Sequence, residues 1–358
     1  MGTSAAFFLA RRGVDVTLVE PNAIGAGATN ASFGNIRRTG RFLPQLPLAH
    51  RSRALWGQAE KLLGRDVEFR ATGHLRLIFD AKSHADMRRF AKAAAPWGLT
   101  LEELDAADLR RRFAGLGADA IGASFSAQDG SANPRLIAPA FAAAAARAGA
   151  IILPHTRVGA ITRTPAGFAV LTSGGPLEST VLLNCAGAWG KAIAAQFHED
   201  VPLSMHGPQM GVTEPLPHRI LPVVGMWSQQ SGAYLRQVER GNVVFGGGVT
   251  RTPVDPQTGH AKADPHLLAQ QLKTVVRLVP ALQDVAVIRQ WSGCEGYIAD
   301  DLPVMGPSGT TPGLFHAFGF CGHGFQLGPG VGDAMAELIA TGTCETPLAP
   351  FDIKRFAA

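Results

Sequence analysis

Residues 1–20 read M-G-T-S-A-A-F-F-L-A-R-R-G-V-D-V-T-L-V-E, which predicts a helix followed by a strand that ends in an acid. Apolar residues recur at helical spacing, as in Ala5 and Leu9, and the glycine after the two arginines can end the helix. The branched residues that follow are typical of a buried strand. In a dinucleotide-binding βαβ unit, Gly2 would be the last glycine of G-x-G-x-x-G. Glu20 would then lie near the ~20-residue distance at which a carboxylate binds a ribose hydroxyl.

The strand and the two glycines that open such a unit do not precede Gly2 in this sequence. We therefore expect a nucleotide-binding fold that lacks its first strand because the sequence is truncated within the glycine motif. Either the start codon was assigned too late, or the chain is a disabled copy. A secretory signal peptide is the alternative for a short apolar start. Arg11 and Arg12 argue against it, because they follow the apolar stretch instead of preceding it.

The composition favours an enzyme, built of two connected domains or of one large α/β unit, and argues against several other classes. The 358 residues include 46% hydrophobic residues and 42 glycines, which suits a well-buried, turn-rich protein. The net charge of +5, from 33 Lys and Arg against 28 Asp and Glu, comes without the dense basic stripe that binds nucleic acid. No run approaches the ~20 apolar residues of a membrane span. We therefore expect neither nucleic-acid binding nor a transmembrane segment.

The cysteines indicate the kind of compartment and argue against a metal site. Cys185, Cys294, Cys321 and Cys344 occur singly, without a C-x-x-C pair. This spacing argues against a zinc or iron–sulfur site and against a disulfide framework, so we expect no metal. A reducing cytoplasm is the expected location.

Helix-like and strand-like segments alternate along the chain, and the pattern changes in its middle part. From about residue 201 to 289 the sequence reads as short strands followed by one helix. We predict an α/β protein in which a Rossmann-like domain, its first strand missing, carries an inserted α+β substrate domain with a mostly antiparallel sheet. The predicted boundaries are 1–70, 133–200 and 300–358 for the nucleotide-binding domain, and 71–132 and 201–299 for the substrate domain.

Two glycine-rich segments have the composition of ligand-binding turns. Residues 22–40 are rich in Gly, Ala, Asn and Ser, which let backbone amides approach a ligand closely. Near the C-terminus, a strand at 314–319 leads into Gly322 and Gly324 and then into a helix through 334–339. Such a turn presents N–H groups and a positive helix end to an anion, which would suit a reduced flavin. A tight structural connection is the alternative.

Four motifs, in this order, resemble one known family. They are the partial glycine motif with its acid, G-A-T-N-A-S-F-G at 27–34, V-L-L-N-C-A-G-A-W at 181–189, and D-x-x-P-V-M-G-P to G-H-G-F at 300–325. Over nearly the whole chain the sequence resembles the D-amino-acid-oxidase-like (DAO) family of FAD-dependent oxidoreductases. This family includes glycine oxidase, sarcosine oxidase, and subunits of opine or proline dehydrogenases. The resemblance implies FAD as the cofactor and makes the Rossmann-like domain an FAD-binding domain.

Position by position, the resemblance implies the residues that bind the cofactor, mostly through their backbones. Gly2 would face the pyrophosphate, Glu20 the adenosine ribose and Val158 the adenine. The other implied contacts are Thr29, Ser32, Phe33 and Gly34 near the pyrophosphate and flavin, Ala186, Gly187 and Trp189 along the cofactor, and Gly322, His323, Gly324, Phe325 and Gln326 at the flavin pyrimidine edge.

The resemblance also implies a reaction and a set of partners. The substrate would be an amino acid or secondary amine of the glycine, sarcosine, D-amino-acid, proline or opine type. Hydride transfer from its C–H bond next to nitrogen to flavin N5 would give an imine, and this needs no dedicated protein base. The chain could assemble with other oxidoreductase subunits or an electron acceptor. The alternative is a non-catalytic or FAD-deficient subunit that keeps the fold.

The residues that anchor the substrate in relatives are replaced in this sequence. Glu295 follows W-S-G-C where glycine-oxidase-like members have an arginine nearby, and Gln326 follows G-H-G-F where sarcosine-oxidase-like members have a lysine. Arg37, directly after the small-residue loop, is the best remaining cation, because a guanidinium can bind a carboxylate with two parallel bonds. Arg38 is the competing choice, and surface exposure of both is the alternative.

Four further residues complete the candidate catalytic set with Arg37. Tyr234 in G-A-Y-L-R resembles a family position near the substrate, and Tyr297 lies beside the W-x-G turn. For each, a buried tyrosine with a satisfied hydroxyl is the alternative. His323 could donate a hydrogen bond or a proton, although its implied role is to shape the loop. Gln326 enters the set because it stands in the place of the family lysine.

Overall fold

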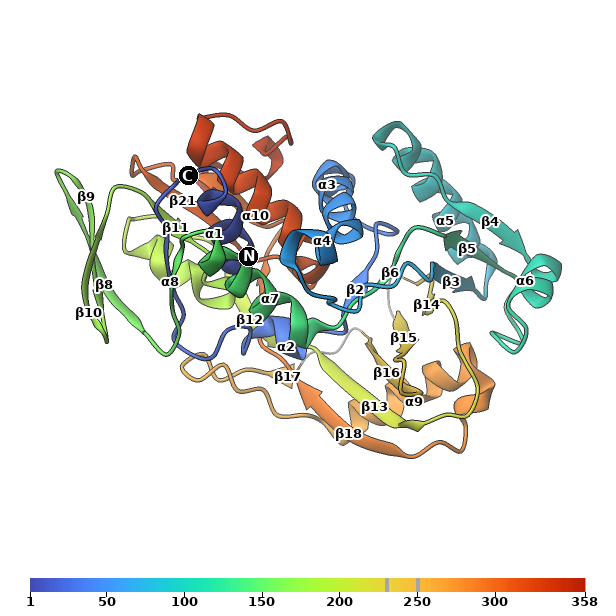
Figure 1. The fold of residues 1–358 in the computed structure, drawn as a ribbon. Coiled ribbons are helices and arrows are strands. Elements are labelled where there is room, and N and C mark those ends of the chain that lie inside the picture. Colours follow the sequence, from blue (N-terminus) through green and yellow to red (C-terminus); the bar gives the residue numbers. More distant parts are fainter. Residues whose placement is uncertain (229–231, 249–251, 358) are drawn as a thin grey trace.

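The computed structural model describes residues 1–228, 232–248 and 252–357. Figure 1 shows two connected halves, one built around the central helices α1, α3 and α10, the other around a large twisted sheet. The described helices are α1 (Gly2–Ala10), α2 (Ala28–Ala31), α3 (Leu46–Gly57), α4 (Ala59–Leu63), α5 (Ala81–Ala94), α6 (Ala106–Arg112), α7 (Pro134–Arg147), α8 (Gly190–Ala195), α9 (Pro265–Leu278) and α10 (Gly324–Thr341).

The described strands fall into several small sheets and one of eight strands. In chain order they are β1 (Thr17–Val19), β2 (Asn35–Ile36), β3 (His74–Ile78), β4 (Glu102–Asp105), β5 (Gly122–Ser126), β6 (Gly130–Ser131), β7 (Ile151–Leu153), β8 (Val158–Thr164), β9 (Gly167–Thr172), β10 (Gly175–Ser179), β11 (Leu182–Asn184), β12 (Leu203–Gly207), β13 (Gln209–Pro215), β14 (Val223–Met226), β15 (Ala233–Gln237), β16 (Asn242–Gly247), β17 (Thr252–Pro253), β18 (Val287–Ser292), β19 (Glu295–Ile298), β20 (Val304–Pro307) and β21 (Leu314–Phe318).

Parallel strands flank the start of α1. β1 pairs in parallel with β7, and β11 pairs in parallel with β21. A Cβ atom on Gly2 would lie 3.4 Å from Leu18 Cδ1, in β1, and 3.6 Å from Cys185 Cβ, directly after β11. The two parallel pairs therefore lie on either side of the first turn of α1, as a Rossmann-like fold requires. The expected strand before Met1 stays a prediction.

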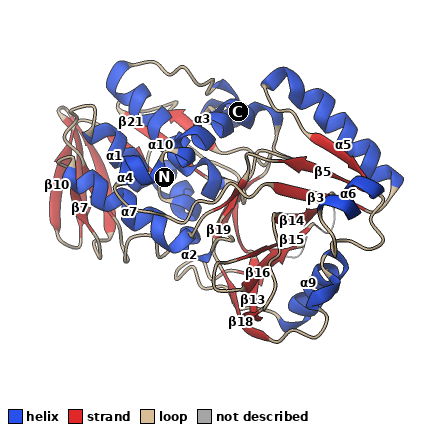
Figure 2. Cartoon of the chain, turned by 45° about the vertical axis from the view of Figure 1, so that its right-hand side comes forward, coloured by secondary structure: helices blue, strands red, loops and turns tan. Residues whose placement is uncertain are grey.

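The eight-stranded sheet has two unlike faces. Its order is β18-β13-β16-β15-β14-β3-β5-β4, and every neighbouring pair is antiparallel except β14 with β3. Helix α9 covers one face (Figure 2), where apolar side chains such as Leu235, Phe245 and Val275 are fully buried. The other face, which we call the inner face, turns toward the loop of residues 31–41. The prediction of an α/β fold with a mostly antiparallel second sheet is confirmed.

Helix α10 packs unusually close to the two helices beside it. A Cβ atom on Gly332 would lie 2.3 Å from Ser4 Oγ and 2.5 Å from the Ser4 carbonyl carbon, in α1. A Cβ atom on Gly330 would lie 2.7 Å from Ser52 Cβ and 2.9 Å from its backbone nitrogen, in α3. The glycines of G-P-G-V-G thus let α10 approach one neighbour on each side, since side chains there would collide with backbone atoms.

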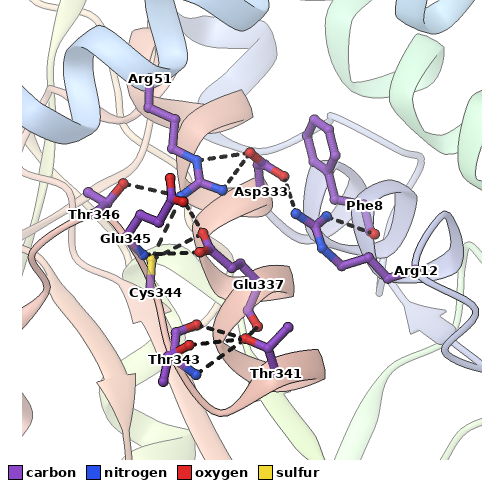
Figure 3. A network of polar contacts seen from close by, with 10 residues as sticks. All are labelled: Phe8, Arg12, Arg51, Asp333, Glu337, Thr341, Thr343, Cys344, Glu345 and Thr346. Carbon is purple, nitrogen blue, oxygen red and sulfur yellow. Dashed lines mark hydrogen bonds and ion pairs between the residues drawn. The ribbon is translucent and has the colours of Figure 1, made fainter.

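A polar network fixes the second half of α10 to the same two helices (Figure 3). The Arg51 guanidinium, in α3, donates to Asp333 from Nε at 2.8 Å and from Nη2 at 2.6 Å, and to Glu337 at 2.6 Å. Arg12, just beyond α1, donates to the other Asp333 oxygen at 2.8 Å. These charge-assisted bonds are partly buried, because the Arg51 side chain is only 19% exposed. They hold α1, α3 and α10 in one fixed arrangement.

Replacing Arg51 by methionine is expected to lower the free energy of unfolding by about 2 kcal/mol, because Asp333 and Glu337 would lose their shared partner in a partly buried site. Urea unfolding followed by circular dichroism measures this. The control is Arg89→Met, which removes the pair with Asp86 at a side chain that is 72% exposed and should cost less than ~0.5 kcal/mol. Equal losses for both variants would contradict the role of the network.

Several sequence predictions can be compared with the observed elements. Residues 46–63 do not form one continuous helix: α3 ends at Gly57 and α4 begins at Ala59, because Gln58 between them has φ −112° and ψ 6°, outside the helical range. All strands of the large sheet fall within 71–132 and 201–299. The full domain division stays a prediction. The four cysteines are free thiols. Within the described residues, no helix has the length and apolarity needed to cross a bilayer.

Candidate active site

Two helices begin side by side without a side-chain cap. A Cβ atom on Gly324, at the start of α10, would lie 3.3 Å from Cε of Met1, which precedes α1. Neither helix has a side-chain hydrogen bond at its N-cap residue. Their first N–H groups and positive dipole ends therefore face the same region, an arrangement that fits an anionic group such as the pyrophosphate of FAD. Gly322, with φ +77°, makes the turn that leads into α10.

The structure brings Glu20 and the segment that begins β8 together. Glu20 directly follows β1 and accepts the Asn22 N–H at its carboxylate at 2.9 Å, and its carbonyl oxygen accepts the Thr156 N–H at 2.9 Å. Val158 follows two residues after Thr156 and is half-buried. Both predicted adenosine contacts thus lie at the carboxyl ends of β1 and β7, where ligands of open parallel sheets bind.

The small-residue loop after β1 is held from both halves of the molecule. The Gly34 N–H donates to Ser32 Oγ at 3.0 Å, and Gly34 has φ +86° with its Cα against the Ala132 carbonyl oxygen. From the large sheet, Arg236 donates to the Phe33 carbonyl oxygen at 2.7 Å. Thr29, in α2, accepts the Ser32 N–H at its carbonyl oxygen at 3.2 Å. The loop therefore lies between the cofactor-binding half and the inner face of the sheet.

A buried polar chain supports the turn of Ala186, Gly187 and Trp189. Asn184 Oδ1 accepts the Ala186 N–H at 3.1 Å, while its Nδ2 donates to the Gly190 carbonyl oxygen and lies 3.2 Å from His316 Nδ1. Because Asn184 Nδ2 is a donor, His316 Nδ1 accepts, and His316 Nε2 carries the proton that faces Glu199 at 2.8 Å. Gly187 has φ +58° and open space where a Cβ would lie.

The side chain of Trp189 connects this turn to the other half of the molecule. Its Nε1 donates to the Pro256 carbonyl oxygen at 3.0 Å. A Cβ atom on Gly259 would lie 2.6 Å from the Trp189 ring. The indole is therefore placed against residues 256–259, and the contact that the family resemblance implies between Trp189 and the cofactor stays a prediction.

The Glu199 carboxylate gives this chain a predictable pH dependence. Burial alone would raise its pKa, but hydrogen bonds from His316, the Gly309 N–H and Ser308 outweigh burial and lower it. Its stabilising effect is therefore complete above the unfolded pKa of about 4.3 and is lost as pH falls through the lower folded value. We expect Glu199→Gln to cost about 2 kcal/mol at pH 7 and less at pH 4 in urea unfolding. A difference that grows on acidification would contradict this.

Arg37, in the loop, and Tyr234, on the inner face of the sheet, interact electrostatically. Tyr234 packs edge-on against Phe33, with ring centroids 4.7 Å apart. Burial raises the pKa of Tyr234, as does Glu295, while the positive charge of Arg37 opposes this rise. Burial also lowers the pKa of Arg37, against the attraction of Tyr234 and Asp129. The site thus places a cation and a protonated hydroxyl together in a poorly solvated environment.

Arg38, the competing candidate, is bound elsewhere. It donates to Asp129 from its backbone N–H and from Nε, both at 2.9 Å, and Asp129 is fully buried. This pair occupies the Arg38 guanidinium, whereas Arg37 contacts no carboxylate among the described ion pairs. Arg37 therefore remains the candidate for binding a substrate carboxylate.

The W-S-G-C-E-G-Y segment meets the glycine turn before α10. The Tyr297 hydroxyl donates to Glu295 Oε2 at 2.9 Å. A Cβ atom on Gly322 would lie 3.5 Å from that Glu295 oxygen and 3.6 Å from the Tyr297 hydroxyl. Glu295 also raises the pKa of Tyr234, so both predicted tyrosines interact with the same carboxylate. The sequence marks Glu295 only as a departure from the family pattern, and the structure places it inside the site.

In the G-H-G-F-Q segment, the side chain of His323 has other surroundings than those of Phe325 and Gln326. His323 Nδ1 lies 2.9 Å from Gln45 Oε1, and burial, followed by repulsion from Arg41 and Arg37, lowers the pKa of His323 well below its usual value. Gln326 is 1% exposed and donates to the Ala49 carbonyl oxygen at 2.9 Å. Phe325 packs on Trp56 of α3, with ring centroids 5.3 Å apart. The side chains of Phe325 and Gln326 thus lie on the α3 side of α10, away from the pair of Arg37 and Tyr234.

Three residues near Arg37 were missed by the sequence reading. Strand pairing aligns six residues in one row across the inner face of the sheet: Arg76, Gly225, Tyr234, Gly246, Met210 and Trp291. His74 precedes Arg76 on the same face, and Arg41 lies four residues after Arg37. The sequence signal for His74 and Arg76 was a pair of basic residues at alternate positions of an otherwise apolar strand, H-L-R-L-I.

Comparison with known proteins assigns the family. The model of the DAO family, described as FAD dependent oxidoreductase, matches residues 1–338. This chain belongs to that family. It is thus an FAD-dependent oxidoreductase, and the uncapped starts of α1 and α10, the glycine turn and the loop of residues 28–34 are the elements that fit FAD.

Relatives of this DAO-family chain match it along almost its whole length. Glycine oxidase of Geobacillus kaustophilus (strain HTA426) is 27% identical over 366 residues, which cover 99% of this chain and 94% of that protein. One of the opine oxidase subunits, from Rhizobium meliloti, is 26% identical over 371 residues, which cover 100% and 95%. The crystal structure of L-proline dehydrogenase from P. horikoshii has a TM-score of 0.92 at 27% identity, covering 99% of this chain and 94% of that one.

Proposed function

We propose that this chain oxidises the C–N bond of an amino acid or secondary amine and that Arg37 holds a carboxylate of that substrate. The observation that carries the proposal is the position of Arg37, in the loop that meets the inner face of the sheet, where its charge interacts with Tyr234 of that face. Glycine oxidase and L-proline dehydrogenase, by their names, act on amino acids, which supports this class of substrate. Arginine suits the role because it can bind a carboxylate with two parallel bonds.

The residues around Arg37 fit a substrate that is bound with its amine unprotonated. Tyr234 keeps its proton because its pKa is raised, so its hydroxyl can donate to a carboxylate oxygen. His323 is neutral because its pKa is lowered, so it adds no positive charge that would repel an amine. When bound, FAD would accept a hydride equivalent from the C–H bond next to nitrogen, and the resulting imine would hydrolyse in water. The protein would contribute positioning, exclusion of water and charge.

The test is purification of the chain, a flavin absorbance spectrum, and anaerobic mixing with D- and L-amino acids, N-methylated glycines and opines. We expect stoichiometric flavin and its bleaching by at least one of these compounds. A protein that takes up FAD but is bleached by none of them would disprove the proposed substrate class. A protein that takes up no FAD would favour the alternative of an FAD-deficient subunit.

We also infer that the chain works with other oxidoreductase subunits or an electron acceptor. The opine oxidase relative is, by its name, one subunit of an assembly, and it matches all of this chain. Oxygen consumption measured against dye reduction tests the inference. Fast turnover with dye and slow turnover with oxygen is expected, whereas rapid oxygen consumption by the isolated chain would contradict it.

A further inference from the structure

Three arginine side chains come together where the loop of residues 35–45 crosses the inner face of the large sheet. A Cβ atom on Gly40 would lie 2.1 Å from Arg76 Nη1 and 3.6 Å from Arg37 Nη1, so these guanidiniums meet beside one backbone atom. Arg41 donates from Nε to the backbone carbonyl oxygen of Arg37 at 2.8 Å, and the positive charge of Arg37 also acts on the Arg41 guanidinium. The sequence predicted one substrate-binding cation, Arg37, and this site contains three cations.

Buried polar atoms without a hydrogen-bond partner gather in the same place. Nine such atoms are found among the described residues, and five of them belong to β3 or to residues 35–45: Asn35 Oδ1, Thr39 Oγ1, Arg41 Nη1, Gln45 Nε2 and His74 Nδ1. Arg41, Gln45 and His74 are only 4%, 0% and 2% exposed. Buried polar groups are almost always paired, because a missing partner costs free energy. Arg41 and Gln45 leave N–H donors, which require an acceptor from outside the chain.

The positive charges of this cluster are only partly balanced by the protein. Burial, and then repulsion from Arg37, lowers the pKa of Arg76 to about 9 and that of Arg41 well below its usual value. The carboxylate that counteracts this at Arg41 is Asp129, which already accepts two bonds from Arg38. Like charges in a poorly solvated site repel strongly unless an anion lies among them. The cluster therefore fits more than one negative charge.

We propose that the substrate carries two carboxylates, which Arg37, Arg41 and Arg76 share. The chemical class is a dicarboxylic amino acid or an amine whose nitrogen bears carboxyalkyl groups. This inference rests on the proposed function and narrows its substrate. A single carboxylate bound by two parallel bonds would occupy one guanidinium and leave two cations and the unpaired Arg41 and Gln45 donors as they are. A second carboxylate supplies the missing charge and acceptors.

Matched pairs of substrates test the inference on the FAD-loaded enzyme. Iminodiacetate is compared with sarcosine, which has a hydrogen in place of the second carboxylate, and D- and L-glutamate with D- and L-norvaline. Within the preferred substrate pair, we expect kcat/KM with an artificial acceptor to be at least ~100-fold higher for the dicarboxylate than for the monocarboxylate. This is the size of effect expected from one buried, charge-assisted ion pair. Equal or better turnover of the monocarboxylates would overturn the inference and leave the proposed function intact.

Binding of unreactive acids decides the case in which no amine is oxidised. Glutarate and butyrate differ by one carboxylate, and both are titrated while the flavin absorbance and the thermal midpoint are followed. We expect glutarate to bind at least ~100-fold more tightly than butyrate. If no amine bleaches the flavin, the proposed function fails. Equal binding of the two acids overturns the inference, independently of turnover.

Variants of the two additional arginines provide the structural control. Arg41→Met and Arg76→Met are expected to reduce glutarate binding ~100-fold and butyrate binding less than ~3-fold, because each removes a charge that only the second carboxylate needs. Arg41→Lys and Arg76→Lys, which keep the charge, should retain most of the preference and guard against a folding defect. Arg219→Met, at an exposed position, should change neither ligand. Equal loss of both ligands in the methionine variants would overturn the inference.

Discussion

The Arg37→Met variant is expected to lose roughly 100- to 1,000-fold in kcat/KM while keeping its FAD, because it leaves a desolvated substrate carboxylate without its paired charge. The Arg37 pKa is lowered by burial, so its charge acts in a poorly solvated environment where Coulomb interactions are strong. Steady-state dye reduction measures the loss, and the flavin absorbance of the purified variant shows whether the cofactor is retained.

Two further variants separate charge from geometry at this position. Arg37→Lys keeps the positive charge but cannot form two parallel bonds, so an intermediate loss of about 10-fold is expected. Arg240→Met, at an exposed site near the end of β15, should leave kcat/KM unchanged. If Arg37→Met turned over substrate at the normal rate, the carboxylate would have to bind elsewhere, and the proposed role of Arg37 would be wrong.

The sequence predicted several local backbone features of the region around the candidate site. Gly2 and Glu20 bracket a helix and a strand whose order alone indicates nucleotide binding, and the structure places Glu20 beside the segment that leads to Val158. Gly322 adopts the positive φ of a turn that leads into a helix N-terminus. Such features follow from short-range rules about glycine, helix ends and alternating strands.

The remainder of the site depends on strand register, which the sequence does not contain. Arg76 and Tyr234 share one row of the inner face only because β14 lies between β3 and β15 and aligns Gly225 with both residues. A shift of one residue would send Arg76 to the face covered by α9. Helical phase explains a second difference: Gln326 turns toward α3 because α10 begins at Gly324, a boundary that the glycine-rich sequence did not fix.

The glycines of α10 suggest how the family's C-terminal segment holds the cofactor-binding helices together. Gly332 touches the α1 backbone, and Gly330 touches the α3 backbone, so the starts of α1 and α10 are aligned by direct backbone contact. The Arg51 network then fixes the far end of the same three-helix group. Both uncapped N-termini are predicted to bind the anionic part of the cofactor, so a small shift of α10 against α1 should weaken FAD binding directly.

Replacing Gly332 by alanine is therefore expected to lower the free energy of unfolding by about 3 kcal/mol and to weaken FAD binding at least ~10-fold. The new methyl group would lie within 2.6 Å of the Ser4 and Ala5 backbones, which cannot rotate away, so α10 must move. Urea unfolding and flavin fluorescence titration of the apoprotein measure the two effects.

Gly328→Ala is the matched control for this substitution, in the same helix and one turn earlier. Its Cβ atom would meet only Met1 Sδ, at 3.9 Å, an ordinary contact. Because alanine favours a helix over glycine by up to ~1 kcal/mol, this variant should be as stable as the parent or slightly more stable, with unchanged FAD affinity. If Gly332→Ala behaved in the same way, close backbone packing of α1 on α10 would not be what aligns the two helix starts.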